Sequence, residues 1–210
     1  MMKRKLLMLI LLIASAPTLL QARLPSSWFF DRFRLGVEWG YTQCFFLARN
    51  YNFFSEEGYR IHEQFSGMHL ASNGSIYGQI GYDLHEKVNL ALYVGYIGVG
   101  EDNRLLPVQL RASFFPKTTG EDGLFTFAQG GPAWHTIAGG FNLGWLAGLG
   151  GGYRLTLSED CNLDLMMGVK YLWDHPRIPN PERAGYVPAH NIRRNDAGYC
   201  ALDLTIAINF

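Results

Sequence analysis

The chain has 210 residues, with 18 basic and 18 acidic side chains and three cysteines. This balanced charge excludes the strongly basic surface by which proteins hold nucleic acids, so no nucleic-acid partner is expected. Glycine, at 24 residues, and aromatic residues, at 14% of the chain, are abundant for a soluble domain and suit a tightly curved β wall. Beyond the N-terminal segment no apolar run reaches about 18 residues, so the sequence excludes a helical membrane protein.

The first 22 residues have the pattern of a secretory signal peptide. Three basic residues precede an apolar run over residues 6–13, and the small residue Ala22 offers a cleavage point. The run is too short for a membrane-spanning helix, and no cysteine follows the cleavage point to carry a lipid. We expect export and cleavage, which leaves residues 23–210 as one domain with 15 basic against 18 acidic side chains.

Residues 33–47 predict the first strand, after a short lead-in. Large apolar side chains alternate with small or polar ones, and a period of two is that of a strand with two different faces. One face in lipid and the other toward a polar interior would explain both sets. The apolar set is Leu35, Val37, Trp39 and Tyr41, and the other set is Gly36, Glu38, Gly40 and Thr42.

Six further segments alternate in the same way. Two stretches between strands, residues 48–64 and 174–198, break the alternation and are predicted as long loops, and short turns join the other strand pairs. A bulge or irregularity is expected near Pro132, because proline cannot donate to a β ladder. The predicted strands cover residues 67–84, 88–96, 107–114, 124–134, 142–155 and 163–171.

The closing strand, residues 199–210, gives the clearest signal. Apolar residues occupy every second position, and the chain stops on an aromatic residue; the apolar set is Cys200, Leu202, Leu204, Ile206, Ile208 and Phe210. This ending resembles that of small Gram-negative outer-membrane β-barrels of the OmpA and OmpX type. The resemblance implies an all-β, eight-stranded antiparallel up-and-down transmembrane barrel in the outer membrane. It also implies that Ile206, Ile208 and Phe210 form the signal read by the outer-membrane assembly machinery.

Three cysteines, Cys44, Cys161 and Cys200, cannot all pair with one another. Cys44 and Cys200 fall on the first and last strands, which are neighbours in a closed barrel. Their parity differs, so a disulfide would need a bulge or a shifted register. Buried thiols are the alternative, and the sequence leaves the two open.

Six charged residues fall on the inward face of the predicted strands: Glu38, Asp83, Arg111, Asp164, Lys170 and Asp203. The interior of an eight-stranded barrel is just wide enough to be filled by side chains, so these charges should pair across a filled, non-conducting polar lumen. Lys170 and Asp203 lie on neighbouring strands, and Arg111 is long enough to reach Glu38. A gated ion path is the alternative.

Catalytic and metal sites have little support in the sequence. Some barrels of this size modify lipid A with a histidine and a serine on one strand face, but His69 and Ser72 are three residues apart and therefore face opposite sides. His135 has only Thr136 beside it. His175 and His190 lie in the last predicted loop without a compact partner pair, so neither metal nor cofactor is expected.

The two long predicted loops carry the functional prediction, a structural or adhesive role at the cell surface. Four arginines of the second loop, Arg177, Arg183, Arg193 and Arg194, favour anionic partners such as lipopolysaccharide phosphates, or a protein or glycan ligand. Alternatively, these arginines pair with Glu56, Glu57 and Glu63 of the first loop. A lipid-modifying enzyme and an accessory barrel of an envelope machine are the other functions considered.

Overall fold

A computed structural model describes residues 32–100, 103–136, 143–158, 161–182 and 184–210. By its internal contacts the chain divides into two units, Met1–Phe33 and Arg34–Phe210, and the second unit holds the fold. The predicted signal peptide, residues 1–22, lies outside the described residues. Within the described part of the chain, no helix is long and apolar enough to cross a membrane.

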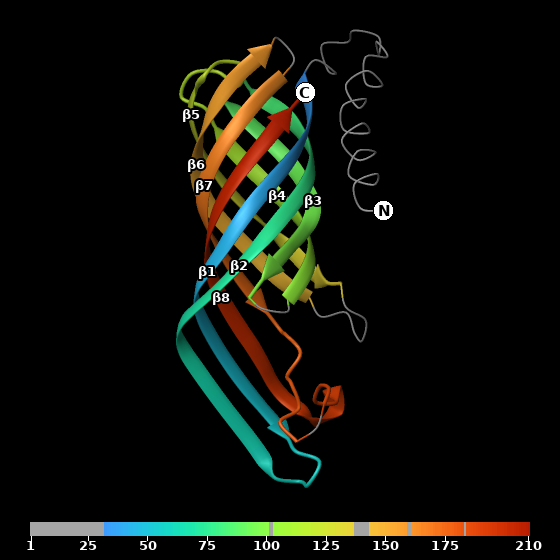
Figure 1. Ribbon diagram of the computed structural model, residues 1–210. Helices are drawn as coiled ribbons and strands as arrows, with labels where there is room; N and C mark the ends of the chain where they lie inside the picture. Colours follow the sequence, from blue (N-terminus) through green and yellow to red (C-terminus); the bar gives the residue numbers. More distant parts are fainter. Residues whose placement is uncertain (1–31, 101–102, 137–142, 159–160, 183) are drawn as a thin grey trace, which may run out of the picture. The chain divides into compact units, whose positions relative to one another are not determined.

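Eight antiparallel strands form one closed barrel in which each strand pairs with its neighbours in sequence and β1 pairs with β8 (Figure 1). This confirms the predicted all-β, eight-stranded up-and-down barrel. The strands are β1 (Phe33–Phe54), β2 (Arg60–His85), β3 (Val88–Val99), β4 (Asn103–Phe114), β5 (Gly123–His135), β6 (Leu143–Ser158), β7 (Cys161–Asp174) and β8 (Ile192–Asn209).

The alternation of side chains along β8 matches the prediction from its sequence. Leu202, Leu204 and Ile206 are about half exposed on the outside of the wall, whereas Asp203 and Thr205 between them are buried in the interior. Exposed and buried residues alternate because successive side chains of a strand point to opposite sides of the sheet. Inward-facing glycines leave room for the aromatic rings of the interior. A Cβ added to Gly150 would lie 2.5 Å from Cζ of the buried Phe127.

The prediction of the first long loop is wrong. Instead of a loop over residues 48–64, β1 continues to Phe54 and β2 begins at Arg60, with a tight turn between them. The strands persist because β1 keeps its ladder with β8 beyond the barrel, from Asn50↔Asp196 to Phe53↔Ile192. The apolar alternation stops there because this part of the hairpin has no lipid to face. The backbone is still a strand, although the sequence no longer shows the strand pattern.

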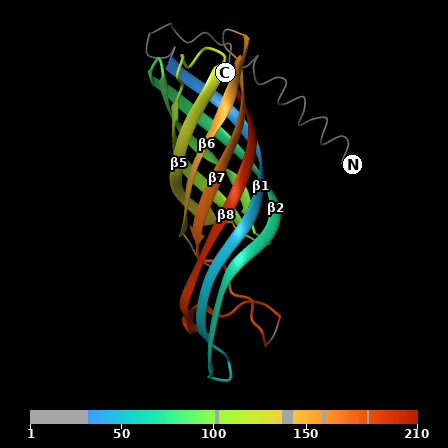
Figure 2. The same cartoon turned by 90° about the vertical axis from the view of Figure 1, so that its left-hand side faces the viewer.

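The second predicted long loop is shorter than residues 174–198. Because β7 ends at Asp174 and β8 begins at Ile192, only residues 175–191 are irregular, apart from a short 3-10 helix, η2 (Ala189–Asn191), and a bridge between Pro179 and Tyr186. Together with the outer parts of β1, β2 and β8, this loop forms a protrusion at one end of the barrel (Figures 1 and 2). We call the opposite end, where the short turns lie, the turn end.

Two smaller predictions concern prolines: the predicted start of the fourth strand is wrong, and the irregularity expected near Pro132 is present. β4 begins at Asn103 rather than at Pro107, and Pro107 lies inside the strand opposite Ala133. Near Pro132, the pairing of β5 with β4 is interrupted between Pro107↔Ala133 and Leu110↔Gly130 without a change of register, because a proline has no N–H for the ladder. The irregularity is therefore a gap in the ladder and not a bulge.

A bulge does occur in β1 between Cys44, which pairs with Ala201, and Phe46, which pairs with Cys200. All three cysteines are free thiols. The Cys44 thiol is buried, and its Sγ donates to the carbonyl oxygen of Phe46 at 3.5 Å. The bulge is the one the cysteine pair would have needed, but Cys44 remains on the inward face while Cys200 is only partly covered.

The protrusion has a small core of its own. Tyr51 and Phe53 of β1 pack against Ile178 and Val187 of the 175–191 loop, with Ile61 and Ile192 at the margin. Burial raises the pKa of Tyr51 to about 12, so its hydroxyl stays protonated at any physiological pH. The loop is therefore held against the sheet by apolar contacts and is not a loose surface segment.

We expect Phe53→Ala to loosen the protrusion and leave the barrel folded. Removing a buried phenylalanine side chain costs about 3–5 kcal/mol in a well-packed core, and this core is too small to absorb that loss. Limited proteolysis should then cut within residues 175–191, while the heat-resistant migration of the folded barrel on gels is retained. Phe54→Ala, on the opposite strand face, is the matched control. Equal protease resistance of wild type and Phe53→Ala would contradict this account.

Candidate functional site

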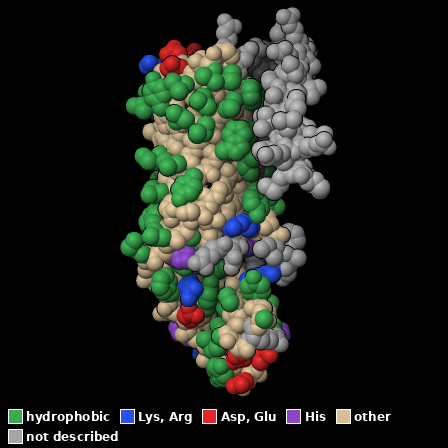
Figure 3. Space-filling view, in the orientation of Figure 1, with side chains coloured by type: hydrophobic (Ala, Val, Ile, Leu, Met, Phe, Trp, Pro, Cys, Tyr) green, Lys and Arg blue, Asp and Glu red, His purple; other side chains and the backbone are tan. Residues whose placement is uncertain are grey.

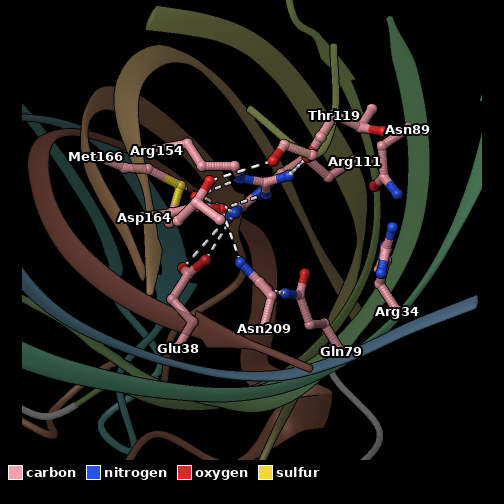
Figure 4. Close-up of polar contacts among 12 residues, drawn as sticks. Arg34, Glu38, Gln79, Asn89, Arg111, Thr119, Arg154, Asp164, Met166 and Asn209 are labelled. Carbon is pink, nitrogen blue, oxygen red and sulfur yellow. Dashed lines mark hydrogen bonds and ion pairs between the residues drawn. The ribbon is translucent and has the colours of Figure 1, made fainter. Parts of the chain in front are cut away.

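The barrel interior at the turn end is polar, and its charged side chains are paired. Arg154 Nη2 lies 2.6 Å from Asp164 Oδ2, and its Nε donates to Asp164 Oδ1 at 2.7 Å. Asn209 Nδ2 donates to the same carboxylate at 2.8 Å. Arg34 Nε lies 3.2 Å from Asp83 Oδ2 closer to the turns. Both of these interior carboxylates therefore have a cation beside them. The Arg154–Asp164 pair is drawn in Figure 4.

The centre of the lumen is a bidentate pair between Arg111 and Glu38. Arg111 Nη1 donates to Glu38 Oε2 at 2.6 Å and Nη2 donates to Oε1 at 3.2 Å. Its Nε donates to Gln129 Oε1 at 2.7 Å, and the guanidinium lies 3.9 Å from the ring centroid of Tyr93. Charges taken out of water need such complete partners, because an unpaired buried charge costs several kcal/mol. The pair crosses from β4 to β1 through the middle of the barrel (Figure 4).

A fourth ion pair, between Lys170 and Asp203, lies closer to the protrusion. Lys170 Nζ is 2.8 Å from Asp203 Oδ2, and Thr42 Oγ1 donates to Asp203 Oδ1 at 2.7 Å. The ammonium also lies 5.3 Å from the ring centroid of Tyr77. The structure thus brings all six predicted lumen charges into the interior and pairs them as Glu38–Arg111, Lys170–Asp203, Asp164–Arg154 and Asp83–Arg34.

Sequence reasoning missed two of these cations, Arg34 and Arg154. Both have the inward parity of their strands, Arg34 with Gly36 and Glu38, and Arg154 with the interior glycines of β6. That parity was the available signal. It was overlooked because both residues lie near predicted strand ends, where an arginine is ordinarily solvated.

The lumen is not polar throughout, which corrects the predicted polar filling. The half nearer the protrusion is sealed by a cluster of buried apolar side chains to which all eight strands contribute. Just beyond this apolar seal, His135 Nε2 lies 2.7 Å from Oδ1 of the fully buried Asp174. The seal consists of Cys44, Leu47, Ala71, Ile97, Val99, Leu105, Ala133, Leu146, Leu172, Ala197, Tyr199 and Ala201.

Interior space is small. The cavity at the turn end, between Arg34, Arg111, Arg154 and Asp164, has about 20 Å³ of room, which suits about one water molecule. Two features therefore oppose ion passage: the pairs that fill the polar half and the dry apolar seal above them. Among the described residues, the geometry is that of a plug and not of a pore.

The outside of the barrel wall has the opposite character. Large exposed apolar side chains occur on every strand. On the face seen in Figure 3 they cover the wall, and charged side chains gather toward the ends. Trp145, Trp173, Tyr171 and Tyr96 project near the protrusion end, and Phe114, Tyr153 and Phe210 near the turn end, as in the aromatic girdles of membrane barrels. A closed barrel with this wall satisfies its backbone internally and presents hydrocarbon outside. The chain has the fold of the small outer-membrane barrels.

Comparison with known proteins adds structures but no activity. No protein-family model matches the chain, and no curated protein matches it. Neisserial surface protein A has 12% sequence identity and a TM-score of 0.48, covering 84% of this chain and 95% of that one. OprG of Pseudomonas aeruginosa has 12% sequence identity and a TM-score of 0.47, covering 85% of this chain and 96% of that one. The N-terminal barrel domain of Pseudomonas aeruginosa OprF has 18% sequence identity and a TM-score of 0.40, covering 83% of this chain and 97% of that one. Similarities this low carry no argument about function.

The residues considered for catalysis do not form a site. Ser72 is exposed on the outer face of β2, where its hydroxyl donates to Gln43 Oε1 at 2.6 Å and accepts from Tyr41 at 2.8 Å. His69 lies on the other face of the strand, as the odd spacing predicts. His135 pairs with Asp174, but no hydroxyl or thiol nucleophile is hydrogen-bonded to it among the described residues. The described chain also has no group of three His, Cys, Asp or Glu side chains that could hold a metal ion.

The arginines of the predicted second loop lie on the protrusion. Arg177 stacks on Tyr186 with 5.2 Å to the ring centroid, Arg193 lies 5.6 Å from that of Phe54, and Arg194 Nε donates to Asp196 at 2.7 Å. Arg183 lies outside the described residues. Glu63, an expected partner of these arginines, pairs instead with Arg49 of β1.

A double-mutant cycle should show that Glu38 and Arg111 stabilise the barrel as a pair. Glu38→Ala alone leaves a buried guanidinium without its counter-charge and should lower the free energy of unfolding by roughly 3–5 kcal/mol. Glu38→Ala with Arg111→Met should cost much less than the sum of the two single variants. The measurement is urea unfolding in lipid vesicles. Additive single effects would mean that the 2.6 Å contact contributes no coupling.

The sealed lumen should not conduct ions. In planar bilayers the purified protein is expected to give no steps above background, because ions meet both the paired charges and the dry apolar seal. Replacing the buried Leu105 by Ser or Ala, which opens the seal but keeps the ion pairs, should not create a channel either. Stable, ion-selective steps from the wild-type protein would overturn the plug assignment.

Proposed function

We propose that this protein is an integral outer-membrane barrel that holds a rigid protruding sheet at the cell surface for binding to a macromolecular partner. The observation that carries the proposal is the protrusion itself, a structured extension of three barrel strands with its own core of Tyr51, Phe53, Ile178 and Val187. Rigid scaffolds lose little conformational entropy when they bind, which favours recognition.

The orientation follows from the two ends of the barrel. In outer-membrane barrels short turns face the periplasm and long connections face outward. The predicted signal peptide and the aromatic C-terminal strand fit the same route of export and assembly, with Ile206 and Phe210 on the outer face of β8 and Ile208 between them at the turn end. The protrusion then faces the cell exterior, and the apolar wall lies in the membrane.

The exposed composition of the protrusion suits a binding surface. Tyr59 and Tyr186 are each about half exposed, and Tyr59 donates to Glu182 Oε1 at 2.6 Å, which joins the hairpin tip to the loop. Arg193 and Arg194 are exposed beside them. Tyrosine and arginine are the residues that most often dominate binding energy at protein interfaces. We favour a protein partner with acidic groups; lipopolysaccharide phosphates are the competing anionic target.

A barrel without its protrusion tests this function. Replacing residues 50–64 and residues 175–196 each by a two-residue Asn-Gly turn, the second directly between the paired Asp174 and Ala197, should leave the barrel folded. Bacteria that display the full chain should adhere to surfaces coated with a matrix protein such as fibronectin several-fold more than bacteria that display the barrel alone. Surfaces coated with lipopolysaccharide, read in parallel, distinguish a lipid target.

The matched control is a charge variant in which Arg177, Arg193 and Arg194 are replaced by Gln. If anionic groups on the partner matter, this variant loses adhesion while its protrusion resists protease as the wild type does. Equal adhesion by the full chain and the barrel alone, with both present at the surface, would contradict a binding role for the protrusion.

A further inference from the structure

The protrusion leaves one long strand edge without a neighbour. β2 begins at Arg60, but its pairing with β3 runs only from His85↔Val88 to Ser75↔Ile97. Residues 60–74 therefore pair with β1 alone among the described residues, over roughly 50 Å at about 3.3 Å per residue. In Figure 1 this stretch of β2 forms the outer border of the protrusion.

The other border of the protruding sheet is covered. Beyond Asp174, where β7 ends, the 175–191 loop runs beside β8, and Asn195 Nδ2 donates to the carbonyl oxygen of Pro176 at 2.5 Å. The His175 ring also hydrogen-bonds to the Asn195 carbonyl. The sheet thus has one covered edge and one edge, on β2, that is not covered by described residues.

The backbone direction at this edge can be assigned. Ser55 N–H donates to the Tyr59 carbonyl at 2.9 Å, so Tyr59 directs its polar groups toward β1. In an antiparallel strand this direction alternates from one residue to the next. The odd-numbered residues after Tyr59 therefore pair with β1, and the even-numbered ones, among them His62, Gln64 and Ser66, direct N–H and C=O away from the sheet.

The edge lacks the usual protections against pairing. Natural edge strands are shielded by lysine, proline, bulges or short length. The segment over residues 60–74 contains neither lysine nor proline. It is also long, and most of its residues are exposed. We infer that this edge of β2 binds an extended polypeptide segment of another protein, which adds to the sheet as a fourth strand. The inference rests on the proposed function and names the mode by which the protrusion engages its partner.

The side chains along the edge restrict the partner's sequence. Ile61 and Phe65 lie on the face that continues the apolar core of the protrusion, and Arg49 lies 5.5 Å from the Phe65 ring centroid. Arg60, His62 and Gln64 lie on the opposite face. The strand that fits has apolar residues at every second position and acidic or amide residues between them.

A second copy in the same membrane does not fit this edge. Two copies that share a membrane are related by an axis along the membrane normal, so their β2 strands both run toward the membrane. An antiparallel ladder between the two edges needs strands that run in opposite senses. We therefore favour a segment of a different molecule, which can form the antiparallel ladder that a second copy in the same membrane cannot form.

The probe for a test is a synthetic nonapeptide with valine at every second position and aspartate or asparagine between. It should bind the full-length protein in lipid nanodiscs and slow hydrogen exchange across residues 60–72. The same peptide with N-methylated amides on its pairing edge cannot form the ladder and should bind at least about tenfold more weakly, since each backbone hydrogen bond contributes roughly 1 kcal/mol. Equal binding of the two peptides overturns the inference without need of any variant.

Gln64→Pro provides the complementary test from the protein side. Proline there removes an edge N–H but no bond to β1, so the barrel and the protrusion should stay folded and peptide binding should fall about tenfold or more. Gln64→Thr, which keeps the N–H, should bind as the wild type does. Undiminished peptide binding by Gln64→Pro would contradict the assignment of the β2 edge as the peptide-binding site. If that variant also keeps adhesion that the barrel-only protein loses, the proposed surface function stands while the strand-addition mode fails.

Discussion

The ladder between β1 and β8 is the interaction on which the rest of the molecule depends. It runs from Gly36↔Asn209 at the turn end to Phe53↔Ile192 in the protrusion. Its first part closes the barrel and so removes the sheet edge that hydrocarbon would leave unsatisfied. Its second part holds β1 and β8 together beyond the wall, where β2 is the third strand of the sheet. The same pair of strands, with a bulge at Cys44/Phe46, therefore forms part of both the membrane anchor and the surface extension.

Closure of the barrel with eight strands also determines how its interior is filled. The space inside such a barrel is filled by side chains, so the inward residues must satisfy one another. The polar half does this with ion pairs such as Arg111–Glu38, and the other half does it with aliphatic packing around Leu105 and Leu146. Placing the apolar layer next to the protrusion makes the barrel a rigid base. Function is then left to the part of the chain that closure does not constrain.

The protrusion uses the same physical rules with a different balance. Its core is only a few side chains, and its β2 edge is not covered by described residues. A soluble sheet with such an edge would risk aggregation, but the barrel fixes each copy in the membrane with one orientation. Anchoring limits self-pairing and makes a long open edge tolerable. It is this combination, a fixed base and an open edge, that favours recognition of an extended partner.

The sequence by itself determined the barrel. A period of two with an apolar outward set, read along β8 from Leu202 to Phe210, needs only local side-chain alternation, and the inward charges Glu38 and Lys170 followed from the same parity. The extent of β1 and β2 beyond the membrane was decided by tertiary structure, because strands there are held by pairing with β8 and carry no lipid-facing pattern. The apolar seal, too, depended on which inward residues of the eight strands share one level, and strand stagger fixes that level only once the barrel is closed.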